Sequence, residues 1–241
     1  MIRKTIKHTK ECTFIVMTPE IKLKDFPIPR GTGFFISKEG YFITANHVID
    51  GVEDFSKVRF SQPEGAQVLN ISLIKKWANY DIALLKANFD ENKMREFLKN
   101  KDGFPYLEID LKVQTEGTPV YAYGFPLPKV NGIDLGKTQI MFIAYCPRIT
   151  SAIISSEYDI IKPIRGSRDP KFYAIDKSLT YGNSGGPIIL TETGKVFAIV
   201  VRFQPVSIPQ SSNYRVTIPT NYGIISSLNN IEKDLKKELD F

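Results

Sequence analysis

Short runs of β-branched and aromatic residues recur along the whole chain. Turn residues separate them, as in Lys38-Glu39-Gly40, Asn131-Gly132 and Thr193-Gly194. Many short strands with turn signals between them predict an all-β sandwich or a pair of barrels. The predicted strands are Gly33 to Ser37, Tyr41 to Ala45, Leu69 to Trp77, Asp81 to Lys86, Val120 to Gly124, Gln139 to Cys146, Ile149 to Ser155, Lys171 to Ile175, Pro187 to Leu190, Lys195 to Phe203 and Tyr214 to Ile218.

Two segments depart from the strand pattern. Asp90 to Lys101 is polar and predicts a short helix between the two halves of the chain. From Asn221 onward the apolar residues recur at helical spacing, which predicts a terminal helix over residues 223–241. We expect its apolar stripe to cover the protein's own core, with docking of a partner as the alternative. The stripe consists of Ile224, Leu228, Ile231, Leu235 and Leu239.

Composition narrows the class of protein. The chain has 241 residues, 42% of them hydrophobic, which is enough to bury a substantial core in one structural unit. Residues 1–10 are rich in lysine and arginine, but no apolar segment of signal-peptide type follows them. No span approaches the ~20 apolar residues of a membrane helix. We therefore expect a cytoplasmic protein without a membrane partner.

Cysteine usage and charge agree with this picture. Cys12 and Cys146 are the two cysteines, and they could pair only across the fold, so we predict free, buried thiols in a reducing compartment. The net charge is +6, but lysine and arginine are dispersed rather than clustered with aromatic residues. Such a charge is typical of a solvated surface, and binding of nucleic acid is not expected.

The passage Gly182-Asn183-Ser184-Gly185-Gly186-Pro187 places a serine between glycines, directly before an apolar strand. A tight turn of this kind exposes one hydroxyl and leaves nearby N–H groups free to bind an oxyanion. Alone, the pattern is weak, because glycine-serine turns are common. It becomes informative when a base and a carboxylate accompany it.

Two residues could supply those partners. A serine hydroxyl needs a base, and of the two histidines His8 lies in the lysine-rich start of the chain, which leaves His47. Asp81 begins an apolar strand, where a carboxylate needs a partner. Asp50 and Asp54 are nearer to His47 in sequence, but they flank a predicted surface turn, where capping or solvation is the expected role. His47 alone would indicate only a locally hydrogen-bonded histidine.

The order histidine, aspartate, serine is that of chymotrypsin-like enzymes. The motifs resemble those of the S1 trypsin-like serine peptidases, and most of all the HtrA/Deg protease domain, over roughly residues 12–222. The similar segments are Gly31 to Ile49 around the histidine, Asp81 to Lys86, Val120 to Pro126, Thr150 to Ser155, and Asp176 to Pro187 before and around the serine.

The resemblance implies an all-β fold of two packed six-stranded antiparallel β-barrels, chymotrypsin-like, with a C-terminal helix. Residues 1–241 would then form a single peptidase unit. Its N-terminal barrel, residues 12–110, would carry His47 and Asp81, and its C-terminal barrel, residues 115–222, would carry Ser184.

The resemblance also implies the chemistry, which is that of a serine endopeptidase acting on proteins or peptides. Ser184 would be the nucleophile, His47 the base and Asp81 the group that orients it, while the N–H groups of Gly182 and Ser184 would bind the oxyanion. No metal or cofactor is required.

The resemblance places the primary specificity pocket beside the serine. Because no acidic residue stands in its predicted floor, a preference for lysine or arginine is disfavoured, and small or medium apolar P1 residues are expected. The alternative is that these apolar residues face a barrel core. The predicted floor is Ser178, Leu179, Thr180 and Tyr181, and the predicted wall is Ala198, Ile199, Val200 and Val201.

The chain departs from the HtrA/Deg pattern in two respects. It ends at Phe241 without the PDZ domain of that family, and the stretch from Pro128 to Arg148 is longer than usual. A protease-fold binding or sensor module without activity of its own therefore stays an alternative to an enzyme. Control by a regulatory partner and assembly into a homo-oligomer are both left open.

Overall fold

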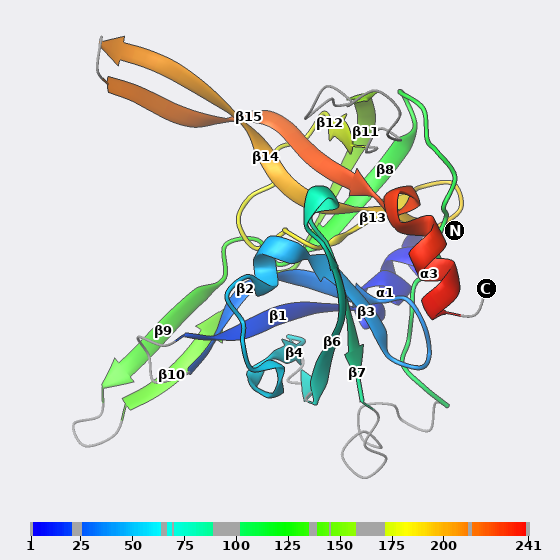
Figure 1. Cartoon of the computed structure of the whole chain (residues 1–241). Helices are drawn as coiled ribbons and strands as arrows, with labels where there is room; N and C mark the ends of the chain where they lie inside the picture. The colour runs from blue at the N-terminus through cyan, green and yellow to red at the C-terminus, as the bar shows by residue number, and fades with distance from the viewer. Residues whose placement is uncertain are drawn as a thin grey trace.

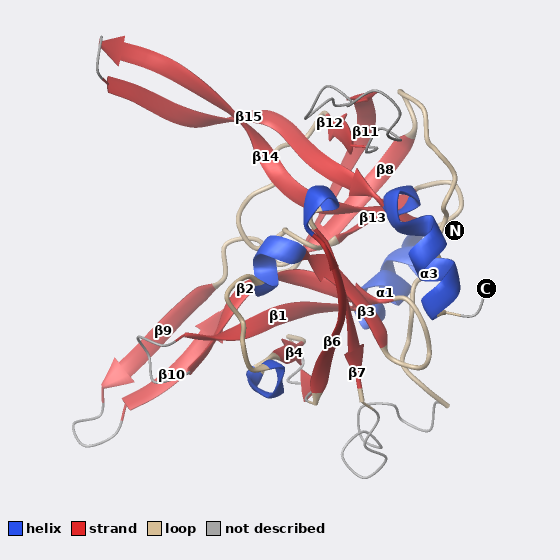
Figure 2. Cartoon of the chain, viewed as in Figure 1, coloured by secondary structure: helices blue, strands red, loops and turns tan. Residues whose placement is uncertain are grey.

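The computed structural model describes residues 2–20, 26–63, 67–68, 70–88, 102–134, 139–144, 146–157, 172–211 and 214–239. Two β-sheets packed on each other make up most of it, and short helices lie at their margins (Figures 1 and 2). The predicted all-β fold is confirmed. The helix predicted over Asp90 to Lys101 lies outside the described residues.

The N-terminal sheet is antiparallel throughout, in the order β5-β4-β1-β2-β3-β7-β6. It has seven strands rather than the six predicted, because the short β5 adds to one edge, and no pairing among the described residues joins β5 to β6. Its strands are β1 (Thr13–Glu20), β2 (Phe26–Phe35), β3 (Tyr41–Ala45), β4 (Arg59–Ser61), β5 (Gln67–Val68), β6 (Ile71–Trp77) and β7 (Ile82–Ala87).

The C-terminal sheet is a closed barrel of six strands, as predicted, in the order β11-β12-β15-β14-β13-β8. Each of these strands therefore has two neighbours in the barrel, although β14 runs on past the end of its pairing with β13 at Ile199. Its strands are β8 (Pro119–Gly124), β11 (Arg148–Glu157), β12 (Phe172–Ile175), β13 (Pro187–Leu190), β14 (Val196–Ser211) and β15 (Tyr214–Ser227).

Two hairpins extend from this framework (Figure 1). One consists of β9 (Lys129–Asp134) and β10 (Gln139–Ala144), a separate two-stranded sheet within the stretch that is longer than in the HtrA/Deg pattern. The other is formed by the outer halves of β14 and β15, paired from Pro205 opposite Pro219 to Ser211 opposite Tyr214. We call this second hairpin the arm.

One hydrophobic core joins the two sheets. Its N-terminal part is rich in phenylalanine, and the rings of Phe42 and Phe60 stack with their centroids 3.7 Å apart. The same cluster includes Tyr121 on β8 and Ile199 on β14, both buried. Because the cluster crosses the boundary between the sheets, it holds them in one fixed relation.

Helix α1 (Ile2–Cys12) was not among the predicted elements. It buries Thr9 and Cys12, and the Thr9 hydroxyl lies 3.0 Å from the Tyr121 hydroxyl in a buried hydrogen bond. Neither cysteine forms a disulfide, as predicted, but Cys146 is exposed rather than buried. None of the described helices is both long and apolar enough to cross a membrane.

The C-terminal helix begins later than predicted. Residues 223–227 belong to β15, and the helical part consists of η5 (Leu228–Ile231) and α3 (Glu232–Glu238). Gly223 to Ser226 pair with β12, and this pairing overrides the helical spacing of Ile224. The side chains of Leu228, Ile231 and Leu235 are buried in the shared core, so the stripe does cover the protein's own core.

The N-terminal sheet binds α3 through Asp234. The indole N–H of Trp77 donates to its carboxylate at 2.6 Å, and the Lys75 ammonium lies 2.8 Å away. The hydrogen bonds from Lys75 and then from Trp77 lower the pKa of Asp234. The charged form of this carboxylate is therefore favoured in the folded state.

We expect Asp234→Asn to reduce the free energy of unfolding by about 0.5–1 kcal/mol at pH 7, the scale of a hydrogen bond and an exposed ion pair. Since the pKa is lower in the folded state, this stabilisation is complete above the unfolded pKa and disappears as the pH falls through the folded pKa. Urea unfolding at pH 7 and near pH 3 measures the difference between variant and parent. Asp50→Asn, at an exposed position, is the control; a difference for Asp234→Asn that is unchanged at low pH would contradict the assignment.

Candidate active site

His47 and Asp81 lie side by side because β3, which precedes His47, is paired with β7, which follows Asp81. β3 ends at Ala45 and continues into η2 (Asn46–Ile49), which contains His47. Asp81 ends η4 (Ala78–Tyr80) and lies directly before β7. Since Ala45 is paired with Ile82, the end of β3 lies beside the start of β7.

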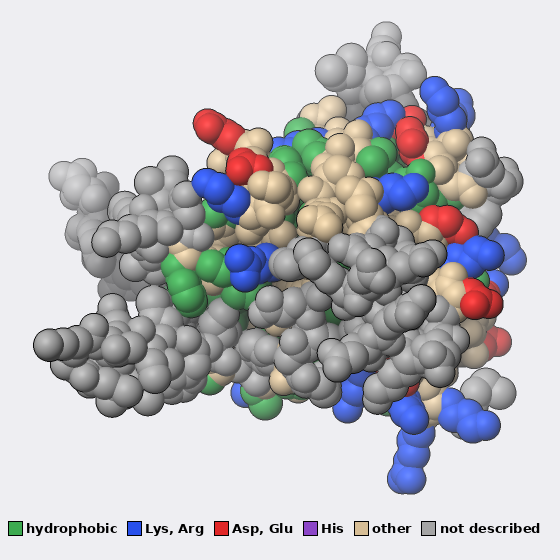
Figure 3. Space-filling view, turned by 90° about the horizontal axis from the view of Figure 1, so that it is seen from below, with side chains coloured by type: hydrophobic (Ala, Val, Ile, Leu, Met, Phe, Trp, Pro, Cys, Tyr) green, Lys and Arg blue, Asp and Glu red, His purple; other side chains and the backbone are tan. Residues whose placement is uncertain are grey.

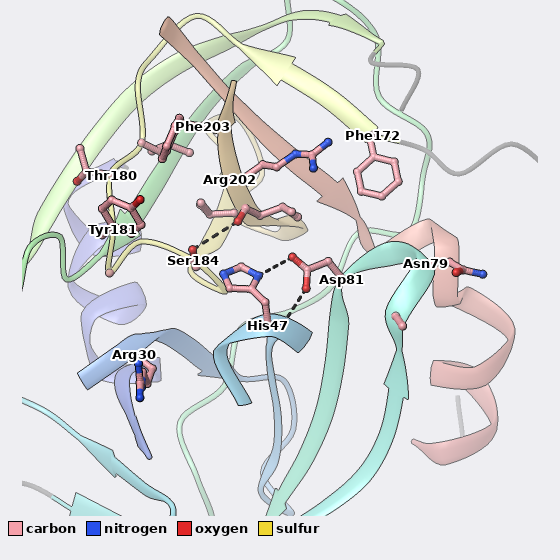
Figure 4. A pocket seen from close by; sticks show the side chains of 15 residues that line it. Arg30, His47, Asn79, Asp81, Phe172, Thr180, Tyr181, Ser184, Arg202 and Phe203 are labelled. Carbon is pink, nitrogen blue, oxygen red and sulfur yellow. Dashed lines mark hydrogen bonds and ion pairs between the residues drawn. The ribbon is translucent and has the colours of Figure 1, made fainter. Parts of the chain in front are cut away.

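The Asp81 carboxylate contacts His47 twice. Oδ2 lies 2.6 Å from Nδ1 of the ring, and Oδ1 accepts the backbone N–H of His47 at 2.9 Å (Figure 4). In a neutral imidazole whose Nδ1–H donates to a carboxylate, Nε2 is the acceptor. Asp81 thus fixes both the orientation of the ring and the nitrogen that can take up a proton.

Ser184 comes from the other sheet, in the turn before β13. The backbone N–H of Thr32 on β2 donates to the Ser184 carbonyl at 2.8 Å, and the N–H of Gly185 donates to the carbonyl of Val200 at 2.7 Å. Gly185 has φ +81, and a side chain there would collide with the Thr32 carbonyl. These constraints place the serine in the cleft that His47 also lines (Figure 4).

The Ser184 hydroxyl points to the backbone in this structure. Oγ donates to the Val201 carbonyl at 3.4 Å, a long and therefore weak hydrogen bond. Within the described part of the chain, no hydrogen bond joins Oγ to the His47 ring. A rotation of the serine side chain would be needed to make that contact.

The turn before the serine presents free N–H groups. Asn183 N donates to the Thr180 carbonyl at 3.1 Å, and Gly182 has φ +93, as the third residue of a type II turn requires. The Tyr181 carbonyl accepts the N–H of Leu127 at 2.7 Å. In a trans peptide the C=O and N–H point in opposite directions, so the Gly182 N–H points away from Leu127.

Gly182 and Ser184 both line the cleft, and among the described residues neither backbone N–H donates a hydrogen bond. Gly182 also leaves no room for a side chain, since a Cβ there would collide with the Phe125 carbonyl. The turn is thus held with two unused donors beside the serine, which is an arrangement that can stabilise a negative oxygen.

The cleft has a volume of about 670 Å³ and contains five of the eight residues predicted for the specificity pocket. These are Leu179, Thr180, Tyr181, Val200 and Val201. The other three predicted residues do not line this cleft. Ser178 is exposed outside the cleft, and Ala198 and Ile199 are completely buried in the two cores, because β14 still pairs with β13 at these positions.

Leu179 is a buried residue of the cleft lining. Its side chain is 2% exposed and packs against Gly223 of β15, where a Cβ would lie 2.8 Å from Leu179 Cδ1. Because Gly223 has no side chain, the Leu179 side chain can fill the space beside it. The surface left beside Ser184 is apolar, formed by Leu179, Val200 and Val201.

Sequence reasoning missed six further residues of the cleft. Arg202 and Phe203 directly follow the predicted wall on the same strand, so a predicted wall two residues longer would have included them. The ring centroids of Phe203 and Tyr181 lie 5.9 Å apart, edge to face. The missed residues are Arg30, Ala78, Asn79, Phe172, Arg202 and Phe203.

The two aspartates near His47 in sequence lie outside the cleft. Asp54 caps η3 (Phe55–Lys57), accepting the Ser56 hydroxyl at 2.6 Å and the Ser56 N–H at 3.0 Å. These hydrogen bonds, that of the hydroxyl first, lower the pKa of Asp54. Asp50 is exposed. Their capping and solvation were the roles expected.

Comparison with solved structures shows the same fold elsewhere. A serine endoprotease from Yersinia pestis matches with a TM-score of 0.63 at 20% sequence identity, over 100% of this chain and 67% of that one. The predicted chymotrypsin-like architecture is thereby confirmed.

Sequence comparison gives the family. A probable periplasmic serine endoprotease, DegP-like, from Bartonella henselae is 32% identical over 163 residues, which is 67% of this chain and 25% of that protein. A serine protease HtrA-like from Staphylococcus aureus is 27% identical over an alignment of 257 residues, 98% of this chain and 29% of that protein. This chain thus spans less than a third of the length of these relatives. The trypsin-like peptidase domain matches residues 31–199, and the chain belongs to that family.

Proposed function

We propose that this chain is a serine endopeptidase in which Ser184 is the nucleophile, His47 the general base and Asp81 the residue that orients and stabilises the imidazolium. The observation that carries the proposal is the double contact of the Asp81 carboxylate with His47, at 2.6 Å and 2.9 Å, in the cleft that Ser184 also lines. Similarity to relatives that are named as HtrA-like and DegP-like serine proteases supports it.

The chemistry is acyl transfer. His47 Nε2 takes the hydroxyl proton as Ser184 Oγ attacks the peptide carbonyl, and the N–H groups of Gly182 and Ser184 bind the negative oxygen that forms. His47 then gives this proton to the leaving amine, and the C–N bond breaks. Water, deprotonated by His47, releases the acyl group from the serine. Asp81 remains ionised throughout.

Substrate itself can free the serine. The Val201 carbonyl that accepts the Ser184 hydroxyl lies where β14 has passed its last partner on β13, Ile199 opposite Pro187. An extended peptide laid along this edge would place its P1 N–H on that carbonyl. Since the serine contact is 3.4 Å long, a substrate N–H competes with it at small cost, and Oγ turns to His47.

The shallow apolar surface beside the serine favours small or medium apolar P1 residues, such as valine, alanine or leucine. Leu179, which fills the space beside Gly223, limits the depth, and Val200 and Val201 supply the side. A long cationic side chain would find no carboxylate in this floor, so cleavage after lysine or arginine is disfavoured.

One observation favours the alternative of a latent binding or sensor module, namely the serine hydroxyl bound to Val201 rather than to His47. A cytoplasmic location is also proposed, and it is supported by Cys12 and Cys146, neither of which forms a disulfide. On the face shown in Figure 3, described basic and acidic side chains are interspersed, in keeping with a protein substrate rather than nucleic acid.

A fluorophosphonate probe tests the triad. We expect covalent labelling of Ser184, located by peptide mass, and its loss in Ser184→Ala and His47→Ala because the nucleophile or its base is missing. Asp81→Asn should slow peptide cleavage by about 10⁴-fold, whereas Asp54→Asn should match the parent. Absence of labelling and of cleavage in folded protein, under every condition tried, would favour the latent module.

Gly182→Ala tests the oxyanion turn. A Cβ at φ +93 collides with the Phe125 carbonyl, so the turn must shift and the Gly182 N–H loses its position. We expect kcat to fall by about 10²–10³-fold. Gly117→Ala is the matched control, because Gly117 also has positive φ, +81, but has open space around it. Full activity of Gly182→Ala would be incompatible with the proposed donor.

Leu179→Ala tests the pocket. Removing this side chain opens the space beside Gly223, so P1 preference should move from valine or alanine toward phenylalanine. Digestion of a peptide library by parent and variant, with cleavage sites read by mass spectrometry, measures the shift. Cleavage by the parent mainly after arginine would reject the apolar pocket.

A further inference from the structure

We propose that Arg202 makes this cleft selective for an acidic side chain, glutamate or aspartate, at the P2 position of the substrate. The inference rests on the proposed peptidase function. It adds a charge requirement to a pocket that otherwise discriminates by apolar size.

Arg202 is an exposed cation that lines the cleft without a partner. No hydrogen bond or ion pair to its guanidinium exists among the residues that the structure describes. The other arginine of the cleft, Arg30, is already neutralised by Glu20 at 2.7 Å. Figure 4 shows the Arg202 side chain reaching over the cleft toward Phe172. A substrate carboxylate would therefore meet a free guanidinium here.

The register of β14 assigns the substrate position. The Val201 carbonyl lies 3.4 Å from Ser184 Oγ, which anchors P1 at Val201. Val201 is also skipped in the pairing of β14 with β15, where Val200 faces Ile225 and Arg202 faces Ile224, so a bulge frees its backbone. In an antiparallel substrate strand the next residue, P2, then lies opposite Arg202.

Side-chain alternation makes the assignment selective. Successive side chains of a strand point to opposite faces, so P2 and P4 share a face with Arg202, and P1 and P3 lie on the other. The residue directly opposite has its Cβ ~5 Å away, and the diagonal neighbour is farther. The one carboxylate lining the cleft, among the described residues, is Asp81, which His47 already engages. Attraction by Arg202 is thus greatest at P2.

Quenched fluorescent peptides test the proposal, with valine at P1 and glutamine or glutamate at P2, P3 or P4, one position at a time. We expect the parent to show a glutamate-to-glutamine ratio of kcat/KM of about two to five at P2 and near one at P3, the range of an exposed ion pair. Arg202→Gln should bring the P2 ratio to one, and Arg202→Glu should invert it. Salt at ~1 M should also reduce the P2 ratio, because screening shortens the range of the attraction.

Arg30→Gln is the matched control, because it removes the same charge from the same cleft while Arg202 stays in place, and the P2 ratio should persist. A parent P2 ratio of one, a ratio that survives Arg202→Gln, or a gain confined to P3 or P4 would overturn the proposal. Cleavage of the all-glutamine peptide together with Ser184 labelling shows the peptidase function independently. If neither occurs, the peptidase function fails, and selectivity falls with it.

Discussion

Thr32 is the residue on which the geometry of the cleft depends. It is completely buried, its N–H binds the Ser184 carbonyl at 2.8 Å, and its hydroxyl donates to the Gly182 carbonyl at 2.5 Å. Its own carbonyl accepts the Thr44 hydroxyl at 2.7 Å. The Thr32 side chain and backbone thus join the turn that carries Ser184, in the C-terminal barrel, to the sheet that carries His47. Gly31 permits the contact, since a Cβ there would lie 2.7 Å from the Ser184 carbonyl.

Backbone strain is concentrated around the same cleft. Of the three described non-glycine residues with positive φ, Asp81 lies in the site and Leu127 holds the Tyr181 carbonyl. Such conformations cost about 1–3 kcal/mol and persist where surrounding contacts fix them. For Asp81 these contacts are its two hydrogen bonds with His47. For Leu127 the contact is the hydrogen bond from its N–H to the Tyr181 carbonyl. These contacts hold the Asp81 carboxylate and the turn before Ser184 in fixed positions, which is what the proposed stabilisation by preorganised dipoles requires.

The sequence predicted structure well where the local residue pattern and the chemistry pointed the same way. It predicted less well where packing or strand pairing decides between two possible roles of a residue. Strand periodicity found the central strands, and the glycine turn with His47 and Asp81 found the residues that the fold brings together. The sequence did not predict α1, because this helix is rich in lysine and buries only Thr9 and Cys12. The predicted C-terminal helix extended into β15, because Ile224 fits both a helical and a strand pattern. Its pairing with β12 makes it part of a strand. The sequence-based prediction put Ile199 in the pocket, although this side chain fills the core between the sheets.

The arm explains why a side chain, rather than the backbone, would set selectivity on the side of P2. Pro205 is paired with Pro219, and since neither has an N–H, this pair makes no ladder hydrogen bonds. Pairing continues without interruption to Pro209 opposite Arg215, four positions on, so the backbones of Pro205, Ser207 and Pro209 point to the same edge of β14. Two of these three positions lack the N–H that a longer substrate strand would need, and prolines at a strand edge also hinder edge-to-edge aggregation. Backbone recognition of a longer substrate is therefore weaker beyond Phe203, and under the proposal the discrimination beyond P1 comes from Arg202.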